Sequence, residues 1–549
     1  MRGFLAAVLW MVCAAGLSAQ PGAGASDYFA IQVVDAATGR GVPLVELKTT
    51  NDIRYVTDSA GRVAFLEPGL MDRDVYYHIS SHGYEYPADG FGYRGKALRT
   101  TPGGSVELTI NRINLAERVY RVTGQGIYRD TVLLGLDAPT REPVFNGRVM
   151  GQDSVLNAVY KGKLYWFWGD TGQEKYPLGH FRTAGAVSRL PGDGGLDPSV
   201  GIDLDYFVDG AGFSRPMAPF PDVKGGLYWL DGLIVLPDDT GKERMIAHAS
   251  HMESLAKRLD HSLVIYNDET ESFELLKPLD DAEELNPVGH PFEAMDEGQR
   301  YFYFPRPYPL CRVRAEWGAV LDPSAYESFT CLKPGTRYDA ESAEVERDEA
   351  GRVVWAWKAG TSWIDHSRQQ ALIDAGKLKA DEAWIDTRDV ESGEPIVLHG
   401  GSVAWNGYRK KWVMIAVQVM GSSLLGEVWY SEADRPEGPW RWARKVVTHS
   451  DYSFYNPRQH PYFEQEGGRV IYFEGTYTDT FSGGEIPDTP LQLQPGDVPA
   501  RSCGPGAEDA ERVGGIVTLS RTRACVRQGD VKGFTITPIV RRTRVICRL

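Results

Sequence analysis

The chain has 549 residues and a formal net charge of −15. That length exceeds what one small hydrophobic core holds, so two or more domains are expected. An acidic surface repels phosphate groups, which argues against a nucleic-acid partner and against an anionic membrane surface. The 14 Trp and 27 Tyr suit a carbohydrate-binding cleft, and they suit the core of a Trp-rich β protein equally well.

The first residues predict a secretory signal peptide. Arg2 provides a short positive region, and Phe4 to Leu17 is almost uninterruptedly apolar. Residues 1–19 therefore match a cleavable signal and are too short to span a membrane. Cys13 lacks the small residues of a lipoprotein cleavage box, so we expect release rather than lipid anchoring. No later segment is apolar enough to cross a bilayer, and the protein is predicted to be periplasmic or secreted.

Residues 28–112 are predicted to form a small N-terminal β-sandwich, because short alternating strands are separated by Gly, Pro and Asp turns. Gly39, Gly41 and Gly61 can supply positive φ, and Asp58 can cap its own turn. The strands are predicted at Tyr28–Val34, Leu44–Thr49, Arg62–Leu66, Asp74–Ser80 and Ser105–Ile110.

The turns of this segment carry a family resemblance. Asp35 to Pro43 reads D-A-A-T-G-R-G-V-P, and Thr57 to Gly61 reads T-D-S-A-G. Both resemble hairpin turns of the carboxypeptidase regulatory-like (transthyretin-like) sandwich. The resemblance implies an accessory domain and says nothing about chemistry. Residues 113–145 then look like a linker that crosses one more strand, at Val119–Thr123.

Residues 146–490 are predicted to form a five-bladed β-propeller, because strand pairs recur with few helical stretches outside Ser367–Ala383. Irregular spacing predicts large insertions between blades, notably around residues 311–395. The strand pairs are Asp153–Val159 with Leu164–Trp168, Leu230–Leu236 with Arg244–Ala249, a third that begins near His290 and returns through Tyr301–Phe304, Ser402–Trp405 with Trp412–Gln418 (extended by Glu427–Ser431 and Trp440–Val447), and Pro461–Glu464 with Arg469–Phe473. The whole chain is thus predicted to be all-β.

Two segments of the large domain carry a second resemblance. Gly426 to Asp434 with Pro436 to Trp440 (G-E-V-W-Y-S-E-A-D, then P-E-G-P-W) resembles a blade signature of glycoside-hydrolase propellers. Gly151 to Asp153 followed by Trp168 to Thr171 resembles the first blade of arabinanase-type propellers. The similarity covers about a third of the domain, and it implies that the aspartates in these first-blade segments are catalytic candidates.

Propeller geometry gathers the polar residues at one mouth, because the start of a blade's first strand, the end of its second and the start of its third share one face. Five of the eleven histidines fall there. From the first blade to the fifth, the residues are Asp153 and Asp170; Asp231, His248 and His251; His290, Glu293 and Arg306; His399, Gln418 and Glu427; His460 and Glu474.

Glycoside hydrolysis needs a carboxylic acid and a second carboxylate. Asp153 is predicted to be the base and Glu427 the acid, with Glu474 as the alternative acid, because a neighbouring aromatic ring can raise a carboxyl pKa by desolvation. Asp170 either tunes the pair, is itself catalytic, or simply completes a turn. Glu474 has the alternative of a buried hydrogen-bond partner. Substrate binding is predicted for Asp231, His248, His290, Arg306, His399, Gln418 and His460.

No cofactor and no metal are predicted, although the propeller axis could hold a structural calcium. The His248-x-x-His251 spacing suits a metal. A continuous strand would send the two side chains to opposite faces, so we do not assign one. Cys311 and Cys331 could form a disulfide in an oxidising compartment.

Residues 491–549 form an atypical tail, which is Arg-, Gly- and Pro-rich and shows no clear strand pairing. A frameshift near Pro490 is one hypothesis. Synonymous codons for Leu491 to Ser502 can be chosen so that the frame one base later encodes Tyr-Asn-Tyr-Asn-Gln-Val-Met-Tyr-Arg-Leu-Asp, which looks like a closing strand. The final strand would then be missing from this chain. The nucleotide sequence of the gene decides the question.

Together these patterns predict an exported glycoside hydrolase-like protein that cleaves a polysaccharide or oligosaccharide through paired carboxylates. The alternative is a non-catalytic propeller whose mouth binds carbohydrate or protein without a working acid and base. Two carboxylates facing each other across the mouth would favour the enzyme.

Overall fold

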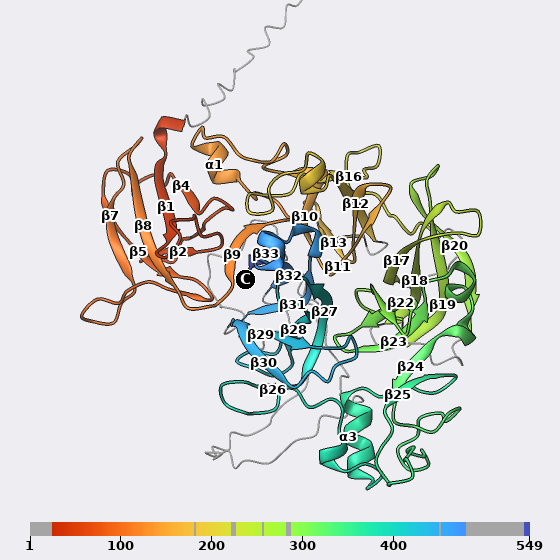
Figure 1. Ribbon diagram of the computed structural model, residues 1–549. Helices are drawn as coiled ribbons and strands as arrows, with labels where there is room; N and C mark the ends of the chain where they lie inside the picture. The colour runs from red at the N-terminus through yellow and green to blue at the C-terminus, as the bar shows by residue number, and fades with distance from the viewer. Residues whose placement is uncertain are drawn as a thin grey trace, which may run out of the picture.

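The computed structural model describes residues 25–180, 183–220, 227–254, 257–280, 287–449, 452–478 and 543–549. Its regular structure is mostly β, as the sequence predicts (Figure 1). The α-helices are α1 (Arg129–Leu133), α2 (Trp317–Val320) and α3 (His366–Asp374), and 3-10 turns lie at Ala25–Asp27, Asn146–Arg148, Pro191–Asp193, Pro323–Ala325, Ala380–Glu382, Pro461–Phe463 and Glu466–Gly468. None of the helices in these ranges is long and apolar enough to cross a membrane. The predicted signal peptide, residues 1–19, lies outside the described residues.

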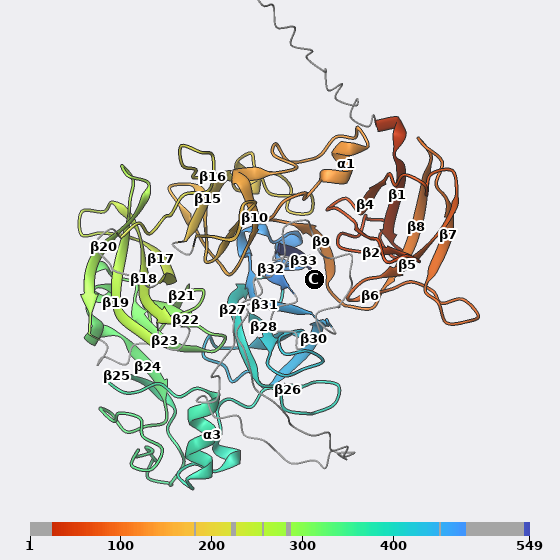
Figure 2. The same cartoon turned by 180° about the vertical axis from the view of Figure 1, so that it is seen from behind.

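The N-terminal part consists of two four-stranded sheets that stand at one side of the molecule (Figures 1 and 2). The first has the order β4 (Arg62–Phe65), β1 (Phe29–Asp35), β8 (Ser105–Arg112) and β6 (Tyr84–Glu85); the second has β3 (Arg54–Val56), β2 (Glu46–Thr49), β5 (Asp74–Ser80) and β7 (Gly95–Arg99). All five predicted strands of this segment are present. Side chains from both sheets, among them Ile31, Leu47 and Tyr77, share one buried cluster.

The turns form largely for the predicted reasons. The Asp58 Oδ1 atom accepts a hydrogen bond from the Ala60 N–H at 2.9 Å, and Gly39 and Gly61 have φ of +69° and +76°. Gly41 has a different role from the predicted one, because it is not among the residues with positive φ. A Cβ atom there would lie 1.9 Å from the Ala60 carbonyl oxygen, so close backbone approach requires the glycine.

Gly61→Ala is expected to destabilise the protein more than Gly69→Ala. Both glycines have positive φ, +76° and +86°, and a non-glycine residue there costs about 1–3 kcal/mol. At Gly61 a Cβ atom would also lie 2.5 Å from the Val33 carbonyl oxygen, whereas at Gly69 nothing lies within 4 Å. Chemical denaturation of both variants measures the difference. Equal losses of unfolding free energy would show that the Gly61 turn is not packed as described.

Five larger sheets follow one another after the linker. The first is β11 (Val155–Tyr160), β12 (Lys163–Trp168), β15 (Ala184–Ser188), β16 (Asp205–Tyr206); the second is β17 (Leu227–Pro237), β18 (Glu243–Ser254), β19 (Lys257–Asn267), β20 (Ser272–Leu279); the third is β21 (Phe292–Asp296), β22 (Gln299–Pro305), β23 (Pro309–Arg314), β24 (Glu327–Thr330), β25 (Ala356–Ala359). The fourth is β27 (Leu398–Asn406), β28 (Lys411–Gln418), β29 (Val428–Ala433), β30 (Trp442–Val447), β26 (Arg388–Asp389); the fifth is β31 (Ser453–Gln459), β32 (Tyr472–Thr478), β33 (Thr543–Arg548), β9 (Glu117–Arg121). A small sheet of β10 (Val149–Gln152), β13 (Thr171–Gln173) and β14 (Tyr176–His180) lies beside the first.

These five sheets pack against one another in a propeller-like arrangement. Each sheet shares a hydrophobic cluster with the next, and the fifth shares one with the first. The strands β11, β17, β21, β27 and β31 are each an edge strand of their sheet, and β11 contacts β17 while β27 contacts β31. Residues of neighbouring sheets that share a cluster include Phe167 and Met245, Ile246 and Phe302, Phe329 and Trp429, Val428 and Phe473, and Tyr472 and Trp166.

The predicted pairing in the fifth sheet is wrong. Pro461–Phe463 is a 3-10 turn, and the strand that pairs with β32 is β31. The inner strand escapes pattern recognition because Pro457 cannot donate a backbone hydrogen bond. Its neighbour Asn456 has a φ of +49°, which places a register irregularity in the middle of the strand.

The expectation that the closing strand is missing is also wrong. Strand β33 comes from the last residues of the chain, and it pairs with β32 on one side and with the linker strand β9 on the other. Val545 and Ile546 are fully buried. The linker strand predicted at Val119–Thr123 is β9. Residues 479–542 lie outside the described residues, so a frameshift near Pro490 stays a hypothesis.

The disulfide suggested between Cys311 and Cys331 is not formed. Both cysteines are free and buried. The register of β23 and β24 places Cys311 opposite Ser328, and Cys331 packs in a separate cluster of the insertion that precedes the fourth sheet. Their thiols are therefore parts of two different cores.

Candidate functional site

Irregular backbone marks one end of this arrangement, which we call the mouth. The register of β17 with β18 shifts after Asp231, that of β27 with β28 shifts around His399, and that of β31 with β32 shifts around Asn456. Such bulges redirect side chains and are frequent next to active sites. Asp153 and Asp170 lie at the corresponding end of the first sheet, just outside the paired residues Val155 and Trp168.

Three side chains link the first and fifth sheets at the mouth. The Ser154 hydroxyl donates to Asp153 Oδ1 at 2.8 Å, and the Asn456 Nδ2 atom donates to the Ser154 hydroxyl at 2.6 Å. Ser154 and Asn456 both have positive φ, +22° and +49°, a conformation that non-glycine residues adopt at a cost. The Asp153 N–H donates to the Asp170 carbonyl oxygen at 3.1 Å. This arrangement fixes the Asp153 carboxylate and keeps Asp170 beside it.

Asp231 links the second and third sheets. Its Oδ1 atom accepts the N–H of Gly289 at 2.6 Å and that of Gly232 at 3.0 Å. Burial raises the pKa of Asp231, and the Arg306 guanidinium together with these two N–H groups opposes the rise. Asp231 is partly exposed as a residue, and its Oδ2 atom takes no part in the two backbone hydrogen bonds. The site thus contains a carboxyl group whose pKa is raised by burial.

Arg306 and His399 bring the third and fourth sheets into the same site. Desolvation lowers the pKa of His399, and the charge of Arg306 lowers it further. His399 is nevertheless exposed to solvent. An exposed ring that the surrounding protein still desolvates is expected on a concave part of the surface. The charge of Arg306 acts on both Asp231 and His399, so Arg306 lies near both groups.

Glu427, the predicted acid, does not open to the mouth. Its carboxylate is fully buried, with Oε2 accepting the Ser422 N–H at 2.8 Å and Oε1 accepting the Thr448 hydroxyl at 3.2 Å. A Cβ atom on Gly421 would lie 1.8 Å from Glu427 Oε2, so the preceding loop wraps closely around the carboxylate. Glu427 holds this loop, and the acid role predicted for it stays a prediction.

Glu474 and His460 are also buried away from the mouth. Both are 0% exposed, and the His460 Nε2 atom lies 3.1 Å from Glu474 Oε1. The other ring nitrogen of His460 lies 3.3 Å from the Asn157 Nδ2 atom, deeper in the interface of the fifth and first sheets than Ser154. These roles were predicted from the wrong inner strand, since β31 and not Pro461–Glu464 pairs with β32, and they stay predictions. Asn456 occupies the place assigned to His460.

The remaining predicted ligands have varied surroundings. His248 is buried between the second and third sheets, with Nδ1 3.2 Å from His261 Nε2 and Nε2 3.3 Å from the Tyr326 hydroxyl. Burial lowers its pKa well below the usual value. Both ring nitrogens have partners in the structure, and the substrate-binding role predicted for His248 stays a prediction. His290 follows Gly289 at the mouth and is 8% exposed. Gln418 is half-buried, and its Oε1 atom accepts the Trp429 indole N–H at 2.8 Å.

His251 and Glu293 are held by ion-pair partners. The His251 Nδ1 atom lies 2.7 Å from Asp260 Oδ2, and Glu293 lies 3.4 Å from Arg300. The described ranges contain no group of three or more His, Cys, Asp or Glu side chains that could hold a metal.

Sequence reasoning missed Ser154 and Asn456. Neither residue type stands out among surface residues, and their link becomes visible only when the fifth sheet closes against the first. One signal was present: Asn456-Pro457 is a dipeptide that marks turns and breaks. In the interior of a strand it indicates a bulge, and a bulge is where a side chain is aimed into a site.

No family model and no curated protein matches the chain. Among solved structures it is similar to an exo-1,5-α-L-arabinanase from a bovine ruminal metagenomic library, with 12% identity and a TM-score of 0.29 over 61% of this chain and 90% of that one. It is also similar to an exo-β-1,3-galactanase from Phanerochaete chrysosporium with galactose, with 8% identity and a TM-score of 0.32 over 66% of this chain and 60% of that one. A third similar structure is the GH43_1 enzyme from Xanthomonas citri complexed with xylotriose, with 13% identity and a TM-score of 0.30 over 60% of this chain and 82% of that one.

Proposed function

We propose that the five sheets are the blades of a five-bladed propeller and that its mouth hydrolyses glycosidic bonds in an exported carbohydrate-active protein. The observation that carries the proposal is the pair of mouth carboxyl groups in unlike surroundings. Asp153 accepts a hydrogen bond from Ser154, whereas burial raises the pKa of Asp231. Two carboxyl groups with different environments divide the roles of base and acid.

In this proposal Asp231 is the acid. It gives its proton to the glycosidic oxygen as the bond to the anomeric carbon breaks, and Asp153 takes a proton from the water that attacks that carbon. Asp170 lies beside Asp153, and the negative charge of its carboxylate acts on this base. Arg306 and His399 bind sugar hydroxyl groups beside the acid. The N-terminal sheets, whose turns resemble the transthyretin-like family, serve as an accessory domain.

Asp231→Asn is expected to lose activity selectively. Without a proton donor, hydrolysis of a polysaccharide should fall by about 10²–10⁴-fold. An aryl glycoside with an acidic phenol as leaving group needs no protonation, so its cleavage should stay within about tenfold of the parent. Measuring kcat/KM for both substrates separates the acid role from misfolding, which would lower both equally. Equal losses would exclude Asp231 as the acid.

Arg306→Gln is expected to move the alkaline limb of the pH–activity profile to higher pH. The guanidinium lowers the pKa of Asp231, so its removal raises that pKa. The acid then stays protonated, and active, up to a higher pH. The control is Arg300→Gln, whose side chain is ion-paired with Glu293. An Arg306 variant whose alkaline limb moves down, or does not move, would contradict the placement of Arg306 beside the acid.

A binding propeller is the second candidate. It is favoured by the burial of both glutamates that were predicted as acids, Glu427 and Glu474. In that case the mouth holds a carbohydrate through Arg306, His399 and the aspartates without cleaving it. Binding without turnover would distinguish it from the enzyme.

A further inference from the structure

A second polar pocket lies at the opposite end of the first sheet. In that sheet Ala184 pairs with Trp168 next to the mouth, and β15 then runs away from the mouth to Ser188. Arg189 follows directly and lines a pocket of about 330 Å³. The pocket is thus separated from the mouth by the length of β15.

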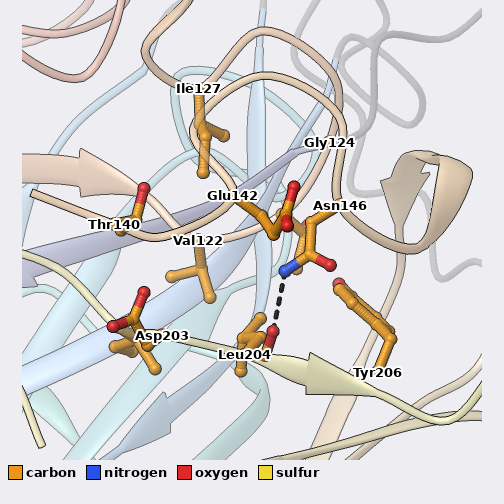
Figure 3. Close-up of a pocket in the computed structure, with 11 residues that line it drawn as sticks. Val122, Gly124, Ile127, Thr140, Glu142, Asn146, Asp203, Leu204 and Tyr206 are labelled. Atoms are coloured by element: carbon orange, nitrogen blue, oxygen red, sulfur yellow. Dashed lines mark hydrogen bonds between the residues drawn. The ribbon is translucent and has the colours of Figure 1, made fainter. Parts of the chain in front are cut away.

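A much smaller cavity adjoins this pocket. Its volume is about 10 Å³, which is room for about one water molecule. Figure 3 shows Asp203, which lines both hollows, and Asn146, whose Nδ2 atom donates to the Leu204 carbonyl oxygen at 2.7 Å. The Thr140 hydroxyl, which also lines the cavity, is buried and has no protein partner among the described residues. The small cavity is too small for an organic ligand, and only the larger pocket has room for one.

The larger pocket has an apolar floor and a charged rim. Pro198 and Phe463 are buried beneath it and Leu196 is half-buried in its wall. On the rim, Arg141 is neutralised by Asp205 at 2.8 Å and by Asp203 at 3.4 Å. Apolar walls with a few convergent polar groups are the usual composition of a small-molecule site, and the volume lies at the small end of the usual range of about 300–1,000 Å³.

Arg189 differs from Arg141 because it has no hydrogen-bond or ion-pair partner in the part of the chain that the structure describes. A Cβ atom on Gly194 would lie 3.3 Å from its Nη1 atom, so a larger residue at position 194 would crowd the guanidinium. Gly194 also has a φ of +83°, which favours glycine in any case. The loop therefore leaves the donors of Arg189 available at the pocket rim.

We propose that this pocket binds an acidic sugar, a hexuronate unit. Its carboxylate forms a charge-assisted pair with Arg189, which is the geometry that a guanidinium fork favours. Its hydroxyl groups donate to Asp203 and Asp205, and one apolar ring face lies over Leu196 and Pro198. At the opposite end of the first sheet from Asp153, such a site holds a glycan without taking part in its cleavage. The proposal does not depend on the function proposed for the mouth.

The test is isothermal titration of the full-length protein with methyl glucuronide, methyl glucoside and inorganic sulfate. Binding of the glucuronide is expected to be tighter than that of either other probe. Arg189→Gln should weaken it by roughly tenfold to hundredfold, and Arg73→Gln, at an exposed position of the N-terminal sheets, should leave it unchanged. Asp153→Asn should also leave it unchanged, which keeps this result separate from the function of the mouth.

Three outcomes would overturn the proposal. Glucuronide binding that survives in the Arg189 variant would place the ligand elsewhere. Sulfate binding as tight as that of the glucuronide would show an unselective anion site. An absence of measurable glucuronide binding to the parent protein would show that the pocket holds no acidic sugar.

Discussion

Asp153→Asn is expected to lower kcat/KM on a polysaccharide substrate by about 10²–10⁴-fold. Asparagine has nearly the same shape as aspartate, and its carbonyl oxygen can still accept the Ser154 hydroxyl, which lies 2.8 Å from Asp153 Oδ1 in the parent. It cannot take a proton from water. The loss should therefore appear in turnover, while substrate binding and thermal stability change little.

The matched control for this variant is Asp137→Asn, which makes the same replacement at an exposed position of the linker. It should retain parental activity. If the Asp153→Asn variant retained parental turnover, Asp153 would not be the catalytic base. A loss that comes with an altered circular dichroism spectrum would indicate a structural effect instead.

Ile546→Ala is expected to lower the free energy of unfolding by about 2–5 kcal/mol. Ile546 is 0% exposed and lies in β33, between β32 and β9. Its side chain packs in the cluster that joins the fifth sheet to the first. Truncating it leaves a cavity where the fifth sheet packs against the first.

Ile113→Ala is the control for this second variant, because Ile113 is 61% exposed and its truncation should change stability by less than about 0.5 kcal/mol. Urea denaturation of both variants measures the difference. If Ile546→Ala lowered the free energy of unfolding no more than Ile113→Ala, the last strand would not be part of the core. The hypothesis that this chain lacks a closing strand would then be supported again.

The sequence predicts best what depends on local pattern. In the N-terminal sheets the strand alternation and the Asp58 turn can be predicted from the sequence, since both depend on residues that are neighbours in the chain. Asp153, Arg306 and His399 lie at or beside the ends of β11, β22 and β27, as predicted from local pattern, whereas Asp231 lies inside β17. The roles of these residues stay predictions.

The failures come from contacts that no local pattern encodes. Glu427 precedes its strand as predicted, but whether a carboxylate opens to solvent depends on the loop that includes Gly421, which wraps around it. Glu474 and His460 were misplaced because Pro457 conceals the inner strand of the fifth sheet. The role of Ser154 could not be seen because Asn456 lies 302 positions away in the chain.

Cleavage of glycosidic bonds at the mouth is tested by measuring binding and release of reducing ends in parallel, with the parent protein and a panel of polysaccharides. We expect at least one polysaccharide that the parent binds and hydrolyses, and that the Asp153→Asn variant binds without hydrolysing. A polysaccharide bound equally by both proteins, with no reducing ends released by either across the panel, would contradict this expectation and identify a binding propeller.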